Sequence, residues 1–312
     1  MKVRIGSSVP VLTNPDQSPA ARRAATVAVA EAGMDHLLVA DHVSFFGGAG
    51  ADGLIQAALS LGCRPDLRVI IGIYLLALRH PVPVARQVAD IASAAPGKLM
   101  LGVGVGGEDR HEVEVCGVDP ATRGRRTDEC LTVLRGLLDG ESVTFAGTHI
   151  QVDQAQIQPT PTQPVPIVVG GRSDAAIARA GRAGDGWLAT WVSARRFADA
   201  VQAVQAQAEA AGRHGQEWTH GLNVWCGLGR TKELAERSVA RGMQDFYHLP
   251  FEKFARWSPA GTPGDVAEFL APYIGAGCSM FNLIPCGDDR DETVAMAAEV
   301  RALLQASGTV AG

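Results

Sequence analysis

The sequence predicts one α/β domain, residues 1–312, folded as a closed (β/α)8 barrel with insertions after the fourth and seventh strands. Short apolar or β-branched runs recur along the chain, and an Ala-rich stretch with helical spacing follows each of them. This alternation is typical of a parallel sheet covered by helices. Hydrophobic residues make up 46% of the chain and charged residues 20%, which indicates a soluble protein with a large core.

The order of the elements follows from these runs. Strands are predicted at residues 3–8, 36–40, 69–76, 98–103, 165–169, 186–190, 222–228 and 280–285. Helices are predicted at residues 20–32, 54–61, 83–94, 125–138, 174–183, 195–211, 232–245, 263–274 and 291–305. Ser173 and Thr262 are candidate N-caps. Three glycines are expected at helix ends: Gly33, Gly212 and Gly277.

Two segments interrupt the alternation. Residues 141–152 alternate between apolar and polar side chains around Ala146 and Gly147, which predicts a hairpin, and the Pro-rich sequence QPTPTQPVP follows it. Residues 246–259 are rich in aromatic residues and proline, and two interpretations are open: a lid over the barrel or an oligomer contact.

Charge and composition exclude several classes of function. The net charge of -5 disfavours a nucleic-acid surface, so we expect a small-molecule partner. The longest apolar run, residues 69–78, is about half of the ~20 residues that a membrane helix needs. The chain shows no signal-peptide pattern and no paired cysteines, so we expect a cytoplasmic protein without disulfides. No metal site is expected, because His111, Glu112 and Glu114 are too close together to converge as ligands.

In a barrel of this kind, the residues at the carboxyl ends of the strands carry the chemistry. After the second predicted strand, Asp41 and His42 place a carboxylate beside an imidazole that is suited to proton transfer. A capping aspartate beside a packed histidine is the alternative interpretation. After the third strand, residues 79–81 form a basic cluster that either takes part in the site or is an ordinary solvated loop.

Two glycine-rich segments follow later strands. Residues 101–108, LGVGVGGE, allow a flat ring or a phosphate to approach the backbone closely. They formally contain GxGxxG, but a charged EDRHEVE sequence follows rather than an apolar helix, which disfavours a Rossmann motif. Residues 168–173, VVGGRS, lead directly into a helix whose first N–H groups suit a phosphate, with Arg172 as a cation. A glycine turn required for tight packing is the alternative. Trp187 and Trp191 flank the next strand as core or ring-contacting residues.

Taken together, these motifs resemble the bacterial luciferase-like superfamily. The resemblance rests on Ala-Asp-His at 40–42, Arg-His-Pro at 79–81, Leu-Gly-Val-Gly at 101–104, Gly-Gly-Glu at 106–108, Pro-Ile-Val-Val-Gly-Gly at 166–171, Ala-Gly-Asp-Gly-Trp at 183–187, and residues 261–270 and 276–278. It implies a TIM barrel that binds reduced FMN or the deazaflavin coenzyme F420 in its mouth. The Asp41-His42 pair, the Ala- and Arg-rich composition and the turn at 170–172 look more like the F420-dependent actinobacterial branch.

The resemblance also implies roles for single residues. His42 would be the acid/base near the hydride-accepting carbon, and Tyr74-Leu75 would form a bulge with a non-prolyl cis peptide. Glu108 matches the proton donor of the sugar-phosphate dehydrogenase members, although an additional glycine precedes it here. The implied cofactor contacts come from Asp41, Tyr74, Leu75, Gly104, Val105, Gly106, Val169, Gly170, Gly171, Arg172 and Ser173.

The implied reaction is hydride transfer between F420 and a small organic substrate: an alcohol or carbonyl compound, an imine, or an activated alkene. A reduced-FMN-dependent monooxygenase is the alternative within the same family. A deazaflavin or flavin carrier without turnover is the alternative from another class. Members of the family are often dimers, so a homodimer is expected.

Overall fold

The computed structural model describes residues 2–8, 18–107 and 109–308 of the chain. Among these residues, eight parallel strands close into a barrel with the order β1-β2-β5-β6-β9-β10-β11-β13, and β13 pairs with β1. The strands are β1 (Arg4–Ser8), β2 (Leu37–Val39), β5 (Val69–Tyr74), β6 (Leu99–Val103), β9 (Ile167–Gly170), β10 (Gly186–Thr190), β11 (Gly221–Leu228) and β13 (Met280–Cys286). The predicted closed barrel is confirmed.

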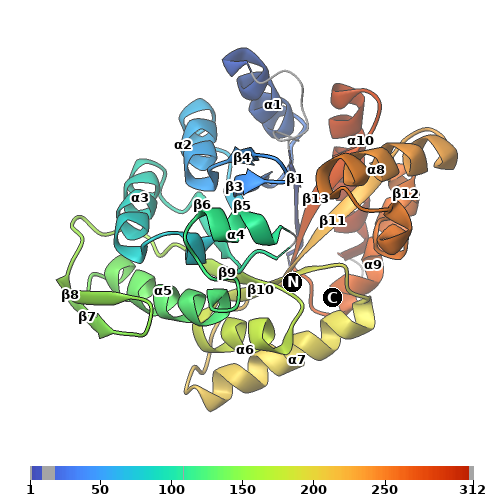
Figure 1. Ribbon diagram of the computed structural model, residues 1–312. Coiled ribbons are helices and arrows are strands. Elements are labelled where there is room, and N and C mark those ends of the chain that lie inside the picture. The colour runs from blue at the N-terminus through green and yellow to red at the C-terminus, as the bar shows by residue number, and fades with distance from the viewer. Residues whose placement is uncertain (1, 9–17, 108, 309–312) are drawn as a thin grey trace.

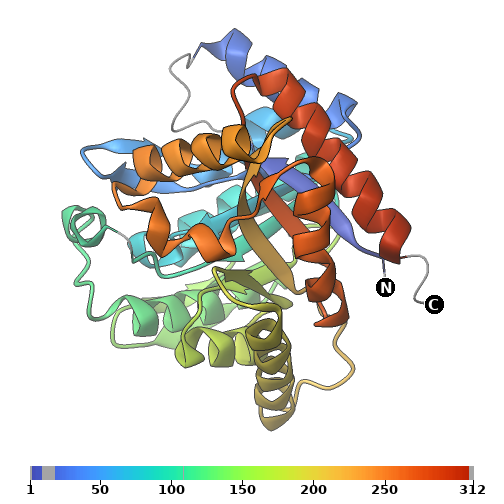
Figure 2. The ribbon, with the colours of Figure 1, turned by 90° about the vertical axis from the view of Figure 1, so that its right-hand side faces the viewer.

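Helices surround the barrel on the outside (Figure 1). They are α1 (Pro19–Glu31), α2 (Gly53–Cys63), α3 (Pro81–Ala94), α5 (Arg123–Leu138), α6 (Asp174–Ala183), α7 (Ala194–Ala210), α8 (Lys232–Tyr247), α9 (Pro263–Gly275) and α10 (Arg290–Gly308). Figure 2 shows the last of these, α10, alongside β1, so the last helix packs beside the first strand of the barrel.

The predicted helix boundaries have the expected chemistry. Ser173 accepts a hydrogen bond from the Ala176 amide at 3.2 Å, and Thr262 forms a capping box with Asp265. After α1, Gly33 has a φ of 74°, a conformation that glycine adopts at low cost. Gly212 and Gly277 likewise have positive φ after α7 and α9.

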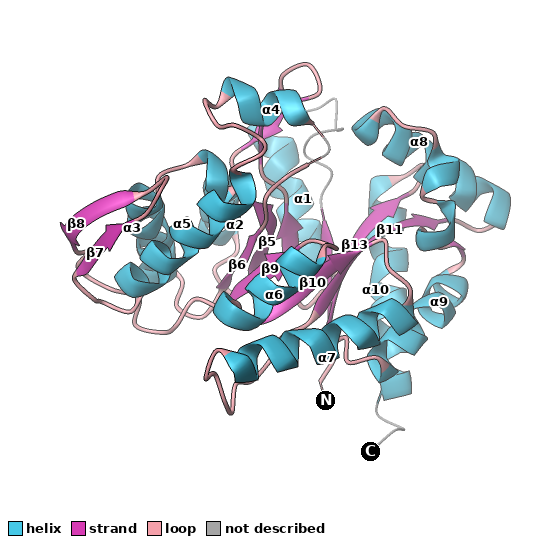
Figure 3. Cartoon of the chain, turned by 60° about the horizontal axis from the view of Figure 1, so that its bottom comes forward, coloured by secondary structure: helices cyan, strands magenta, loops and turns pink. Residues whose placement is uncertain are grey.

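Short elements extend from the barrel between these units. Strands β7 (Val143–Ala146) and β8 (Gln151–Ala155) form an antiparallel hairpin beside α5, as the alternating pattern predicted (Figure 3). The sequence pattern did not predict the hairpin of β3 (His42–Phe45) and β4 (Ala49–Ala51) or the helix α4 (Arg110–Val115). Past α8, the chain forms the turns η2 (Phe251–Lys253) and η3 (Ala255–Trp257) and the bridge strand β12 (Ala260–Gly261); η1 (Leu76–Leu78) follows β5.

Two apolar layers hold the barrel. The larger lies between the strands and the surrounding helices. A smaller cluster lies inside the barrel, and it consists of Leu38, Ile70, Met100, Val168, Leu188 and Met280. Because alternate residues of a strand point to opposite faces, strands β2, β5, β6, β9, β10 and β13 contribute to both layers. None of the described helices combines the length and the apolar composition that crossing a membrane requires.

Two buried histidines make the stability of this fold pH dependent. Burial lowers the pKa of His36 to about 4 and that of His220 to about 4. Both imidazoles therefore stay neutral in the folded chain at pH values where the unfolded chain binds protons. Their contribution is full above pH ~6.5 and is lost as the pH falls toward 4.

We expect the free energy of unfolding to fall by about 1.4 kcal/mol per pH unit for each of these histidines across that window. Urea unfolding at several pH values, in phosphate-free buffer, measures the slope. His220→Gln should reduce this slope of unfolding free energy against pH by about the contribution of one histidine. An unchanged slope in this variant would show that the pKa of His220 is the same in the folded and the unfolded chain.

Candidate active site

The candidate residues gather at the carboxyl-terminal mouth of the barrel. Because all eight barrel strands are parallel, the end of β2 at Asp41-His42 and the end of β9 at Gly170 lie at the same rim. Figure 3 shows α4 and α8 at one end of the barrel. This shared rim is the geometry that the predicted site requires.

His42 opens strand β3 and pairs with a carboxylate from α4. Its Nδ1 lies 3.1 Å from Oε2 and 3.3 Å from Oε1 of Glu112. Glu112 is 3% exposed, and its Oε1 also accepts hydrogen bonds from the backbone amides of Val43 at 2.7 Å and Ser44 at 3.2 Å. The backbone of the β3–β4 hairpin and helix α4 therefore hold the Glu112 carboxylate in the position where it contacts His42.

The chain between Glu112 and the barrel is anchored by a second carboxylate. Asp109 caps α4 by accepting from the His111 amide at 2.9 Å, and its other oxygen accepts from the Phe46 amide at 2.7 Å. Both carboxylates thus tie α4 to the β3–β4 hairpin. This contact explains why the two short elements form together.

Glu112 controls which imidazole nitrogen is free. Burial opposes its ionisation, but the hydrogen bond from His42 and those from the Val43 and Ser44 amides outweigh burial and lower the pKa of Glu112. The ionised carboxylate accepts a hydrogen bond from the Nδ1–H group, so Nε2 of neutral His42 carries the lone pair. This arrangement can accept and return a proton at Nε2.

Sequence reasoning missed this role of Glu112, which it weighed only as a metal ligand beside His111 and Glu114. Among the described residues, no group of three His, Cys, Asp or Glu side chains is placed to hold a metal ion. The pairing joins positions 42 and 112, and no local spacing connects them. Glu108, the predicted proton donor, lies outside the described residues.

Asp41 is 2% exposed and is surrounded by donors. Oδ1 accepts from the Gly53 amide at 2.9 Å and from Arg79 Nη2 at 2.8 Å, while Oδ2 accepts from the Leu75 amide and Arg79 Nη1. Burial raises the pKa of Asp41, and Arg79 opposes this shift. The carboxylate thus joins β2, α2 and the end of β5. Its expected contact with the cofactor stays a prediction.

The predicted position of the cis peptide is wrong. The non-prolyl cis bond joins Gly72 and Ile73, not Tyr74 and Leu75. The pairing of β5 with β6 shifts register between Ile71 and Tyr74, so the irregular residues come before the predicted bulge. Tyr74 is 1% exposed, and its ring packs under the Arg79 guanidinium, 4.3 Å from the ring centroid.

The glycines at the mouth surround the Ile73 side chain. A Cβ at Gly104 would overlap Ile73 Cδ1, and a Cβ at Gly170 would lie 2.7 Å from Ile73 Cγ2. These two glycines therefore make room for Ile73, a reason that the sequence pattern did not reveal. Next along the chain, Gly106 has a φ of 67° and stands against the Leu75 side chain.

The turn at 170–173 leads into α6, and its expected contact with a phosphate stays a prediction. Gly171 has a φ of 130°, Arg172 is exposed, and Ser173 caps α6. The Arg172 guanidinium lies 5.3 Å from the centre of the Trp191 ring. Trp187, by contrast, is fully buried and donates from Nε1 to the Gly171 carbonyl at 2.7 Å, so it belongs to the core.

Two buried polar atoms at the mouth have no partner among the described residues. They are Ser8 Oγ, at the end of β1, and Trp191 Nε1, just after β10. Buried donors of this kind are rare unless a ligand or water binds them. They fit a polar ligand that lies across the barrel mouth.

An aromatic wall stands beside His42. The centroid of the His42 ring lies 3.9 Å from that of Phe45 and 5.7 Å from that of Phe246. Phe246 continues into a cluster with Trp225, Tyr247, Trp191 and Phe254. The aromatic part of the predicted 246–259 insertion thus packs toward the mouth of the barrel.

Comparison with known proteins identifies the family of this chain. Residues 3–269 match the family described as luciferase-like monooxygenase. An uncharacterized protein of Mycobacterium tuberculosis is 42% identical over 113 residues, a match that spans 36% of this chain and only 38% of that protein. An F420-dependent glucose-6-phosphate dehydrogenase of Nakamurella multipartita is 28% identical over 302 residues, with 88% of each chain covered.

The fold has a close counterpart among solved structures. An F420-dependent secondary alcohol dehydrogenase, solved in complex with an F420–acetone adduct, superposes with a TM-score of 0.86. The superposition covers 97% of this chain and 99% of that one, at 19% sequence identity. At this identity, the match shows the shared fold.

Proposed function

Because the chain belongs to the luciferase-like monooxygenase family, we propose that it is an F420-dependent oxidoreductase that transfers a hydride between this cofactor and an apolar alcohol or carbonyl compound. The observation that carries this proposal is the His42–Glu112 pair at the barrel mouth, with Nε2 of His42 left free for a substrate proton. F420-dependent dehydrogenases among the relatives and the alcohol dehydrogenase of the same fold support the choice of cofactor.

The residues present fit such a cofactor. The Gly171–Ser173 turn and Arg172 would hold its phosphate, and the unpartnered Ser8 Oγ and Trp191 Nε1 would hydrogen-bond its polar edges. Glycine at 104 and 170 and Leu75 beside Gly106 shape the adjoining backbone. The bound cofactor supplies the hydride acceptor or donor.

The protein would manage the proton and the substrate. In the oxidative direction, His42 Nε2 would take the proton from the hydroxyl oxygen as the hydride leaves the carbon that bears this hydroxyl, and in the reductive direction it would return the proton to the carbonyl oxygen. Glu112 holds the ring in place and stabilises its protonated form. Phe45 and Phe246 beside the imidazole favour an apolar substrate and exclude water.

Anaerobic titration with F420 and with FMN tests the proposal first. We expect F420 to bind at least about 10-fold more tightly, and the bound cofactor to be reduced by apolar secondary alcohols, followed by its absorbance. Tighter binding of FMN with oxygen-dependent turnover would instead identify a monooxygenase. F420 binding without turnover on any alcohol, carbonyl, imine or enone would identify a carrier.

A further inference from the structure

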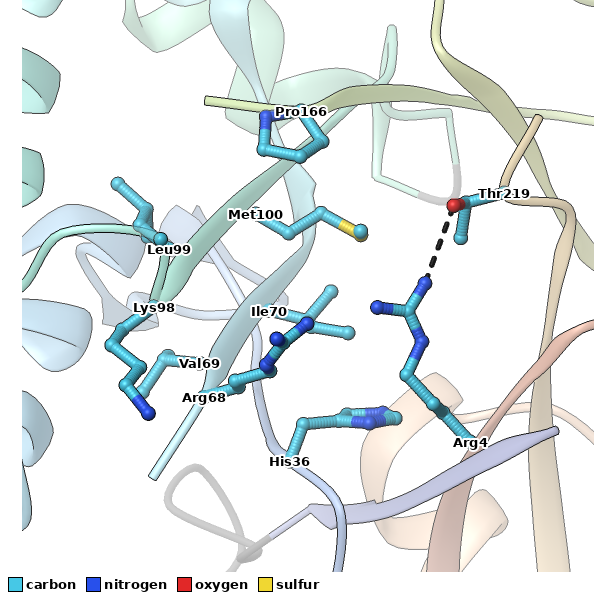
Figure 4. Close-up of a pocket in the computed structure, with 11 residues that line it drawn as sticks. Arg4, His36, Arg68, Val69, Ile70, Lys98, Leu99, Met100, Pro166 and Thr219 are labelled. Atoms are coloured by element: carbon cyan, nitrogen blue, oxygen red, sulfur yellow. Dashed lines mark hydrogen bonds between the residues drawn. The ribbon is translucent and has the colours of Figure 1, made fainter. Parts of the chain in front are cut away.

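A pocket of about 90 Å³ lies at the amino-terminal ends of the barrel strands, at the opposite end from His42. Its polar walls come from residues at or just before the starts of different strands, as Figure 4 shows: Arg4, His36, Arg68, Lys98 and Thr219. Ile70 and Met100 also line it, and both belong to the apolar cluster inside the barrel. This cluster separates the pocket from the barrel mouth.

The pocket carries positive charge that no described carboxylate pairs with. Arg4 donates only to the neutral Thr219 hydroxyl, at 3.3 Å, and the Arg68 side chain has no hydrogen bond or ion pair among the described residues. Arg4 and Arg68 line the same pocket, and burial and then the charge of Arg68 lower the pKa of Arg4. In Figure 4 both side chains extend into the pocket.

The other charged side chains near the pocket, Lys98 and Asp35, already have hydrogen-bond or ion-pair partners. Lys98 donates to the Asp66 carbonyl at 2.8 Å. Asp35, whose charge acts on both Arg4 and His36, is paired with Arg301 at 2.8 Å and accepts from the Ile5 amide. An anion between Arg4 and Arg68 would therefore meet two cations, and the carboxylate nearby, Asp35, is already paired with Arg301.

His36 adds a buried acceptor. It is 1% exposed, and its Nε2 lies 2.6 Å from Asn282 Oδ1, while Asn282 Nδ2 donates to Asn223 at 2.7 Å. Since the amide oxygen of Asn282 must accept, Nε2 of His36 carries the proton and Nδ1 carries a lone pair. His36 Nδ1 is buried and has no partner in the described structure.

From these observations, we propose that this pocket binds inorganic phosphate as hydrogenphosphate. The guanidinium groups of Arg4 and Arg68 bind its unprotonated oxygens, and its P–OH group donates to His36 Nδ1. The volume of about 90 Å³ suits a small oxyanion, since it is several times the roughly 10–15 Å³ that one water requires. The site does not depend on hydride transfer, because it lies beyond the apolar interior of the barrel.

Equilibrium dialysis with labelled phosphate at pH 8 and low ionic strength tests the proposal. We expect one bound phosphate per chain. Arg68→Gln should weaken binding at least about 10-fold, because it removes a charge-assisted contact, and it should leave the fold intact because this side chain is exposed. Arg237→Gln, an exposed arginine on α8, is the matched control and should bind phosphate like the parent chain.

Arg172→Gln distinguishes this pocket from the proposed cofactor turn. Phosphate should still bind to this variant, whereas loss of all bound phosphate would place the anion at the barrel mouth and overturn the proposal. No phosphate bound at millimolar concentration, or equal binding by Arg68→Gln, would overturn it as well. Because this readout uses no cofactor, failure of the proposed hydride transfer would not affect it.

The anion series tests the role of His36. Sulfate and the glycerol phosphate dianion carry no hydroxyl on the central atom at pH 8, so each should bind at least about 10-fold more weakly than phosphate. Equal or tighter binding of either would mean that Nδ1 does not accept a proton from the ligand, and hydrogenphosphate would be the wrong assignment.

Discussion

Replacement of His42 by alanine is expected to lower kcat about 10²- to 10⁴-fold while F420 still binds. Nε2 of this ring is the group left free by the Glu112 contact, and positioned proton transfer contributes roughly this factor. Steady-state kinetics with an apolar secondary alcohol measure kcat, and fluorescence titration measures cofactor affinity. Unchanged turnover would show that His42 does not carry the substrate proton.

The Glu112→Gln variant tests the carboxylate that pairs with His42. The amide keeps the shape of the side chain but loses the charge that stabilises a protonated His42, so kcat should fall less than in His42→Ala and the pH profile should shift. Glu114→Gln, an exposed neighbour on the same short helix, is the control. A loss equal in both Glu variants would indicate a disturbed helix rather than a lost charge.

The barrel could be predicted from the sequence because several buried strands are largely apolar runs, such as residues 69–74, bounded by helical patterns. Strong local signals also located Ser173 and Thr262 as N-caps. The β3–β4 hairpin and α4 were not predicted, because each is only a few residues long. Tertiary contacts through Asp109 and Glu112 stabilise them instead.

The candidate site, like the fold, could be predicted from the sequence only in part. Motif order located His42 and the turn at 170–173 at one rim, because strand ends are visible in the sequence. The partner of His42 lies 70 positions away, and the contacts of Ile73 with Gly104 and Gly170 likewise join three separate segments of the chain. The cationic pocket has the same origin, since Arg4, His36, Arg68 and Lys98 come from separate βα units and form no basic run.

Replacement of Asp41 by asparagine is expected to lower the free energy of unfolding by about 3 kcal/mol or more, because breaking a buried ion pair leaves the partner charge uncompensated. The Asp41 side chain is fully buried, and Arg79 is 18% exposed. Asparagine can present an oxygen to only part of this ring of donors, and its NH₂ group would face a donor from Gly53, Leu75 or Arg79.

Urea unfolding without cofactor measures the effect of Asp41→Asn, and Asp90→Asn is its control. Asp90 forms an exposed ion pair with Arg86, so its replacement should change stability little. The measurement also separates two roles for Asp41. If it anchors β2, α2 and β5, stability falls in the cofactor-free chain. If it binds the cofactor directly, as the family resemblance implies, stability stays near that of the control while cofactor affinity falls, because only the bound state would then use the carboxylate.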